Sequence, residues 1–156
     1  MDPQRDETPA ERMDRNWSEL LQEMRVTQTG VQILSGFLLT VPFQARFTDL
    51  DRAEQMLYLI TTTLSLTATA LIVAPVSVHR ILFRRNAKDS VVTVGNTLAK
   101  VGLAALALTM SAALALIFSV VIDRAAALVA GGAAAVFFAA LWLVVPVRMR
   151  RGNVGP

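Results

Sequence analysis

The chain contains no cysteine, which excludes disulfides, thiolate metal ligands and cysteine nucleophiles. Charged residues make up only 17% of its 156 residues, compared with about 25% in an average soluble domain. The sequence also lacks a Walker loop, a zincin helix, a nucleophile elbow and a dinucleotide fingerprint. We therefore expect a protein that is not an enzyme and that has no cofactor.

Charge is absent from four long stretches of the chain, residues 26–43, 56–78, 101–122 and 125–147. These stretches are 18 to 23 residues long, and a helix that crosses a bilayer needs about 20 predominantly apolar residues. An ordinary soluble fold is therefore excluded. The sequence predicts an all-α, polytopic membrane domain over residues 26–147, with four transmembrane helices arranged as two antiparallel hairpins.

Residues 1–25 form a polar N-terminal segment. They have no basic region followed by an apolar run, so we expect no cleavable signal peptide. Thr8, Pro9 and Glu11 match the start of a capped helix, and apolar residues then recur at three- and four-residue steps. We expect an amphipathic helix over residues 9–24, which lies on the membrane surface or packs against the protein itself.

Lys and Arg are unevenly distributed between the two sides of the predicted helices. Eleven lie in residues 1–25, in the middle loop and in the tail over residues 148–156, whereas three lie in the two other connections. Positive residues are retained on the cytoplasmic side of a membrane. We therefore expect a protein of the bacterial inner membrane with both termini in the cytoplasm. This orientation explains the net charge of +3 without a nucleic-acid partner.

The middle loop, which joins the second and third predicted helices, is basic. Its candidate contacts with anionic lipid headgroups are Arg80, Arg84, Arg85 and Lys88. His79 is the single histidine and a candidate pH-sensitive residue, because imidazole titrates near neutral pH. A lone histidine without nearby cysteine or paired carboxylates is a poor metal ligand, so no metal site is expected.

Polar residues recur at helical spacing within and beside the first two predicted spans. The first set is Arg25, Gln28, Gln32 and Ser35, and the second is Thr62, Ser65 and Thr69. Each set falls on one face of its helix. Such side chains are costly in contact with lipid, so these faces point into the bundle, toward another subunit or to water. They form either a polar pathway or hydrogen bonds that hold helices together.

Carboxylates are missing from the middle of every predicted span. Proton-coupled transporters commonly carry the proton on a buried intramembrane acid, and only Glu23 and Glu54 approach such a position, each at an edge. Hydrolysis at the lipid interface needs an acid–base pair, and Glu23 with His79 is the only pairing to propose. That pairing rests only on a shared side of the membrane, which is a weak basis for an enzyme.

Small residues recur at three- and four-residue steps in the last two predicted spans and permit close backbone approach. They are Ala104, Ala107, Ser111, Ala115 and Ser119 in the third span, and Gly131, Gly132, Ala135 and Ala139 in the fourth. We expect these faces to pack within the second hairpin or between subunits.

Several stretches resemble an uncharacterised bacterial family of membrane proteins. They are SELLQEMRVTQTGVQIL at residues 18–34, FLL at 37–39, PFQ at 42–44, RF at 46–47, APV at 74–76 and HRILFR at 79–84. The resemblance covers about residues 16–150 and implies four spans, with the first span as the signature region. Some members are automatically named sodium:proton antiporter, but the missing mid-span acid speaks against that activity. The resemblance assigns no catalytic residue.

Two functions fit these patterns. The first is an oligomeric channel or transporter for a small ion or solute, lined by the polar faces of the first two spans. Four short helices enclose little space, so such a pore needs several subunits, and we expect a homo-oligomer. The alternative is a structural or accessory subunit of a membrane complex, in which the N-terminal helix and the basic loop contact a partner or the membrane surface.

Overall fold

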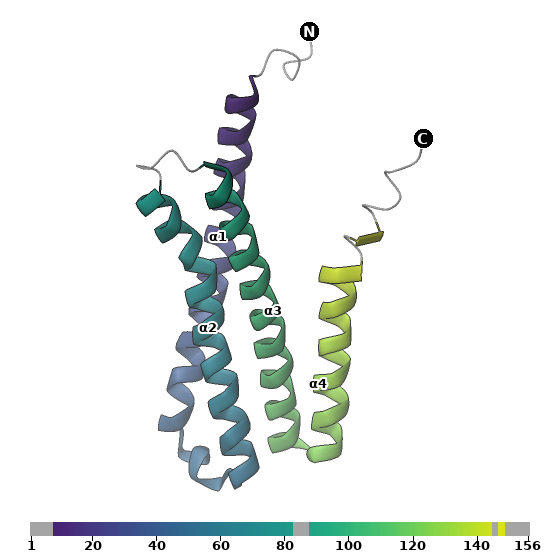
Figure 1. Cartoon of the computed structure of the whole chain (residues 1–156). Helices are drawn as coiled ribbons and strands as arrows, with labels where there is room; N and C mark the ends of the chain where they lie inside the picture. The colour runs from purple at the N-terminus through teal and green to yellow at the C-terminus, as the bar shows by residue number, and fades with distance from the viewer. Residues whose placement is uncertain (1–7, 83–87, 145–146, 149–156) are drawn as a thin grey trace.

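The computed structural model describes residues 8–82, 88–144 and 147–148. Within these residues the regular structure is entirely helical. The four long helices are α1 (Pro9–Thr40), α2 (Arg52–Leu82), α3 (Lys88–Val121) and α4 (Arg124–Ala139). The shorter elements are the 3₁₀ turns η1 (Val41–Phe43) and η2 (Ala45–Asp49) and the π-helical turn η4 (Ala140–Val144). Successive long helices run in opposite directions (Figure 1).

All four helices are long and apolar enough to cross a membrane. The stretches concerned are Arg25–Phe43, Arg52–Pro75, Val94–Val121 and Arg124–Val144. They overlap the four charge-free runs, so the expected all-α class with four apolar helices of spanning length is confirmed. Large apolar side chains such as Phe37 and Leu128 are 70% and 78% exposed, which suits surrounding lipid better than water.

The N-terminal part of the chain departs from the division predicted at residue 25. The sequence predicted an amphipathic helix over residues 9–24 and a separate span from residue 26, but α1 is one continuous helix of 32 residues. Neither glycine nor proline occurs from residue 10 to residue 29, so nothing there breaks the ladder of helical hydrogen bonds. Because an α-helix rises about 1.5 Å per residue, α1 is about 48 Å long. Its N-terminal part projects beyond the ends of α2 and α3 (Figure 1).

Side-chain caps begin both α1, where the sequence predicted a helix start, and α2. The Glu11 N–H donates to Thr8 Oγ1 at 3.3 Å, and the Thr8 N–H donates to the Glu11 carboxylate at 2.8 Å. The Thr8 backbone N–H and hydroxyl hold the pKa of the Glu11 carboxyl below its ordinary value. At α2, Asp51 Oδ1 accepts from the N–H groups of Ala53 and Glu54 at 2.8 and 3.0 Å. Both caps satisfy amides that the helix itself leaves unpaired.

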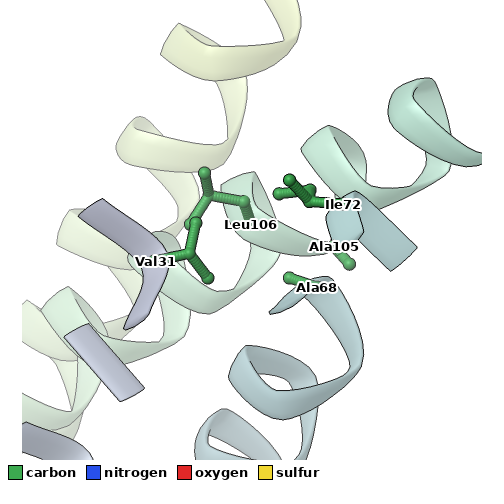
Figure 2. Close-up of a cluster of buried hydrophobic side chains, with 5 residues drawn as sticks. All are labelled: Val31, Ala68, Ile72, Ala105 and Leu106. Carbon is green, nitrogen blue, oxygen red and sulfur yellow. The ribbon is translucent and has the colours of Figure 1, made fainter. Parts of the chain in front are cut away.

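The helices differ in how deeply they are packed. The contact between α2 and α3 is the most extensive, that between α3 and α4 is smaller, and that between α1 and α2 is smaller again. The apolar core joins α1, α2 and α3 through Val31, Ala68, Ile72, Ala105 and Leu106 (Figure 2). Of the spanning stretch at α4 only 11% is buried, compared with 33% at α3. The helices α1 and α4 therefore leave most of their outer surfaces uncovered.

Two glycines bring backbones unusually close. A Cβ atom added at Gly102 in α3 would lie 2.8 Å from Ile72 Cγ1 of α2. One added at Gly131 in α4 would lie 2.8 Å from Ala115 Cβ of α3, whereas a Cβ at the neighbouring Gly132 would meet nothing within 4 Å. Small residues therefore lie at the contact between α3 and α4, which is one of the two arrangements that the spacing predicted.

Candidate functional site

Three hydroxyl groups meet where α1 packs on α2. Ser35 Oγ lies 2.6 Å from Ser65 Oγ and 3.2 Å from Thr69 Oγ1. Ser35 also donates to the Val31 carbonyl at 2.9 Å, and Thr69 donates to the Ser65 carbonyl at 2.9 Å. Ser35 and Ser65 are buried, at 6% and 0% exposure. The structure thus brings together one predicted residue of α1 and two of α2, which we call the hydroxyl cluster.

The bonding in the hydroxyl cluster leaves no spare donor. Each hydroxyl carries one hydrogen. The hydrogens of Ser35 and Thr69 point to backbone carbonyls, and that of Ser65 is therefore free to bond Ser35 Oγ. Every hydroxyl hydrogen of the cluster has a protein acceptor. Because Ser35 and Ser65 are also buried, this arrangement suits a contact that holds α1 against α2 better than a surface that meets a passing solute.

The other predicted polar residues do not join this cluster. Arg25 and Gln32 are exposed on α1, and Gln28 is half-buried. Thr62 is half-buried, and its hydroxyl oxygen is the one buried side-chain polar atom without a hydrogen bond among the described residues. The face predicted on α1 therefore has a buried part at Ser35 and an outer part. The outer part is formed by Arg25, Gln28 and Gln32, and we call it the α1 outer face.

The basic-loop predictions are not tested by the described side chains. Arg84 and Arg85 lie outside the described residues. His79 and Arg80 belong to the end of α2 and Lys88 to the start of α3. Their side chains also lie outside what the structure describes. The lipid contacts and the pH-sensitive role expected of these five residues therefore stay predictions.

Tyr58 of α2 makes a second polar contact with α1, closer to η2 than the hydroxyl cluster is. The sequence did not predict this contact. Its hydroxyl donates to the Leu38 carbonyl at 3.0 Å, and its side chain is only 3% exposed. The ring packs edge-on against Phe47, with 5.2 Å between the ring centroids. One feature of the sequence could have indicated this contact. The single tyrosine lies near the end of a predicted span, where an aromatic ring with a polar hydroxyl is favoured.

An ion pair joins the starts of α2 and α4. Arg124 Nη2 lies 2.7 Å from Asp51 Oδ2, and the two residues are 73 positions apart in the chain. The hydrogen bond from Arg124 holds the pKa of the Asp51 carboxyl below its ordinary value, and the N–H groups of the first turn of α2 act in the same direction. The charge count had already placed both connections on one side of the membrane, so their proximity was available to sequence reasoning, although the pairing was not.

Glu54 lies one turn into α2 from this ion pair and is half-buried. Its Oε1 atom accepts a hydrogen bond from the Ser119 hydroxyl at 2.8 Å, and its Oε2 atom accepts one from the Asp51 N–H at 3.0 Å. Ser119 belongs to the set of small residues that the sequence analysis assigned to packing. The structure therefore gives one member of that set a polar contact with an acid at the edge of the second span.

A groove of about 620 Å³ opens between α2, α3 and α4. Glu54, Ser119 and Arg124 lie along it, and the rest of its lining is apolar or small, apart from Ser111. A groove of about 820 Å³ between α3 and α4, lined by residues such as Met110 and Phe137, is apolar along its whole length. The α2–α3–α4 groove thus combines an apolar body with charged side chains. Among the described residues, no group of three histidines or carboxylates could hold a metal ion.

Comparison with known proteins yields one family. Its description is "Family of unknown function (DUF6328)", and its model matches residues 6–146. This match is consistent with the resemblance to an uncharacterised family that the sequence indicated. No curated protein and no solved structure matches the chain.

Proposed function

Because the chain belongs to DUF6328, a family of unknown function, we propose from its own geometry that it passes a small ion or solute through a membrane as a homo-oligomer. The pathway lies between subunits, along the α1 outer face. The helices insert as two antiparallel hairpins. Neither a cofactor nor catalysis is part of this function.

The exposure of Gln32 is the observation that carries the proposal. Gln32 lies within the spanning stretch of α1 and is exposed, next to Ile33, which is 55% exposed. An amide side chain has two donor hydrogens and an acceptor oxygen, and these are costly to leave unpaired in hydrocarbon. In a closed ring of subunits the same face of every copy turns toward the shared axis, where other copies of α1 and water can supply partners. Gln28, one turn away, extends this polar surface toward Arg25.

The hydroxyl cluster supports a pathway between subunits rather than within one chain. Its three hydroxyl hydrogens have protein acceptors, and Ser35 and Ser65 are buried. The interface between α1 and α2 is therefore closed at this level. Water and ions would have to follow the uncovered side of α1.

Flux through reconstituted liposomes tests this function. We expect the wild-type protein to dissipate a K⁺ or Na⁺ gradient and to be detected as a closed oligomer by native mass spectrometry. The double variant Gln28→Leu/Gln32→Leu should be produced normally and lose most of the flux. Gln44→Leu, which changes an exposed glutamine in the connection after α1, is the matched control and should conduct like wild type. Full flux in the double variant, or a monomer that conducts, would contradict the proposal.

An accessory subunit is the second candidate, and the length of α1 favours it. About half of this helix precedes the spanning stretch, and it begins with a complete capping box. A rigid projection of this kind offers a surface to a partner outside the membrane. This function predicts that removal of residues 1–16 abolishes association with a partner complex and leaves the ion flux unchanged. Flux that falls with the deletion would argue for the first function.

The orientation that we propose has both termini and the α2–α3 connection in the cytoplasm of a bacterium, with the protein in the inner membrane. The uneven distribution of Lys and Arg supports it. In this orientation Arg80, Arg84, Arg85 and Lys88 meet anionic headgroups, and the connections that contain Asp51 and Arg124 lie on the opposite side.

A further inference from the structure

We propose that the α2–α3–α4 groove binds a lipophilic cation, with the Glu54 carboxylate as its charge partner. This site involves other helix faces than the proposed pathway along α1. It therefore stands whether or not the chain conducts ions.

The shape of the groove suits a compact apolar body. Its volume of about 620 Å³ lies within the usual range of small-molecule sites, about 300–1,000 Å³. Leu57, Leu64 and Leu108 supply apolar surface, while alanines and glycines of α3 and α4 leave room between the helices. Because the groove lies alongside the spanning stretches, an amphiphile dissolved in the membrane can enter it from the side.

The charge at the groove is negative overall. Glu54 and Arg124 are the charged residues that line it within the described part of the chain. Arg124 is engaged by Asp51 at 2.7 Å, whereas the hydrogen bonds to Glu54 come from neutral donors, the Ser119 hydroxyl and the Asp51 N–H. Two carboxylates and one guanidinium leave a net charge of −1. Two further exposed charges lie close by, Asp123 beside Arg124 and Arg52 beside Asp51, and they offset each other, so the net charge stays at −1.

This charge selects the sign of the ligand. A carboxylate next to apolar surface interacts more strongly with an opposite charge than one in bulk water, because the local dielectric constant is lower. A cation whose charge is spread over apolar groups loses little hydration when it enters such a site. An anionic amphiphile or the phosphate of a lipid would instead meet the excess negative charge. The groove therefore fits a lipophilic cation better than a lipid of the bilayer.

Two probe ions of the same shape and opposite charge test the proposal. Tetraphenylphosphonium and tetraphenylborate differ in the sign of their charge, so their comparison separates charge from hydrophobic partition. We would measure binding of each ion to the full chain in phosphatidylcholine nanodiscs, after subtraction of binding to empty nanodiscs. Saturable, protein-dependent binding is expected for tetraphenylphosphonium alone.

Two variants locate the binding. Glu54→Gln keeps the side-chain shape and removes the charge, and it should weaken tetraphenylphosphonium binding by about tenfold or more, the usual effect of losing a contact to a charged group. Gly132 lines the groove, and a Cβ there would meet nothing within 4 Å. Gly132→Leu therefore places a large side chain at the groove and should abolish binding. Glu11→Gln, which removes a carboxylate at the start of α1, is the control and should bind like wild type.

Three outcomes would overturn the proposal. The first is equal protein-dependent binding of both ions, which would mean simple partition into an apolar groove. The second is unchanged tetraphenylphosphonium binding in Gly132→Leu and in folded Glu54→Gln. The third is absence of binding together with a change in subunit number in Gly132→Leu, which would make the groove a contact between copies. The wild-type comparison of the two ions keeps the test decisive if Glu54→Gln fails to fold.

Discussion

Ser35 shows how one small hydroxyl group can connect two helices that otherwise share a limited contact. It bonds its own helix at Val31 and lies within hydrogen-bond distance of Ser65 and Thr69 on α2. In an apolar environment such bonds are retained because the alternative is an unsatisfied polar group. The interaction between these residues should therefore be measurable as a coupling energy.

A double-mutant cycle tests the coupling of Ser35 and Ser65. Hydrogen bonds between membrane helices average about 0.6 kcal/mol and reach about 1.7 kcal/mol. We expect the cycle of Ser35→Ala and Ser65→Ala, measured by unfolding in mixed micelles, to give a coupling in that range. The cycle of Ser35→Ala with Thr67→Ala is the control, because the exposed Thr67 hydroxyl bonds only the carbonyl of Thr63. Equal couplings in the two cycles would refute this account.

Asp51 makes stability depend on pH. Its pKa is lowered in the folded protein by the Arg124 hydrogen bond, so folding favours the charged form. The resulting stabilisation is fully present above the ordinary aspartate pKa of about 3.9 and is lost as the pH falls through the lowered folded value. Wild type should therefore be slightly more stable than Asp51→Asn at pH 7, and the difference should disappear in acid. Asparagine keeps the helix cap, so the comparison isolates the ion pair with Arg124. A pH-independent difference in melting temperature would contradict the prediction.

At the scale of helices, α4 depends on close approach to α3. Its spanning stretch is the least buried of the four, and the Gly131 backbone lies against Ala115 and the Ser111 carbonyl. Helix packing without a solvent-driven hydrophobic effect relies on such van der Waals contacts. A methyl group at this point must therefore separate the two helices.

The adjacent pair Gly131 and Gly132 provides a matched test of this packing. Gly131→Ala would place Cβ 2.8 Å from Ala115 Cβ, and overpacking of this kind typically costs about 1–3 kcal/mol. Gly132→Ala meets no atom within 4 Å and should be neutral or stabilise the helix by up to about 1 kcal/mol. Unfolding of both variants in mixed micelles measures the difference. A destabilised Gly132→Ala alongside an unaffected Gly131→Ala would show that α4 packs by another face.

The continuity of α1 is a property of the whole element that the sequence analysis missed. The composition changes from polar to apolar at Arg25, and the sequence therefore predicted one helix over residues 9–24 and a separate first span. Composition reports the surroundings of a helix, whereas its continuity depends on backbone hydrogen bonds, which no glycine or proline interrupts there. A change of environment along a helix is therefore not a reason to end it.

At the scale of the whole molecule, the proposed orientation places the two ends of α1 on opposite sides of the membrane. The chain has no cysteine, so single introduced thiols report accessibility without background. Thr48→Cys, in the exposed connection before α2, should react with a membrane-impermeant maleimide in intact spheroplasts. Ser18→Cys, exposed in the N-terminal half of α1, should react only after the membrane is opened. The reverse labelling pattern would show that the protein has the opposite orientation in the membrane.

The sequence by itself determined the number and the positions of the apolar helices. This was possible because the length of an apolar run is a local property, and each spanning helix satisfies its backbone hydrogen bonds without help from other segments. The capped starts at Thr8 and Asp51 were predictable for the same reason, since each cap involves residues within three positions.

Only the tertiary structure decided which polar groups meet. Ser35 and Ser65 are 30 positions apart, Glu54 and Ser119 are 65 apart, and Asp51 and Arg124 are 73 apart. Their contacts depend on how each helix is rotated about its axis, and that rotation is set by close packing such as that of Gly102 on Ile72. The spacing along α1 placed Gln32 and Ser35 on one face. The packing of α1 on α2 buried the serine and left the glutamine exposed, because a helix covers only part of its neighbour's circumference.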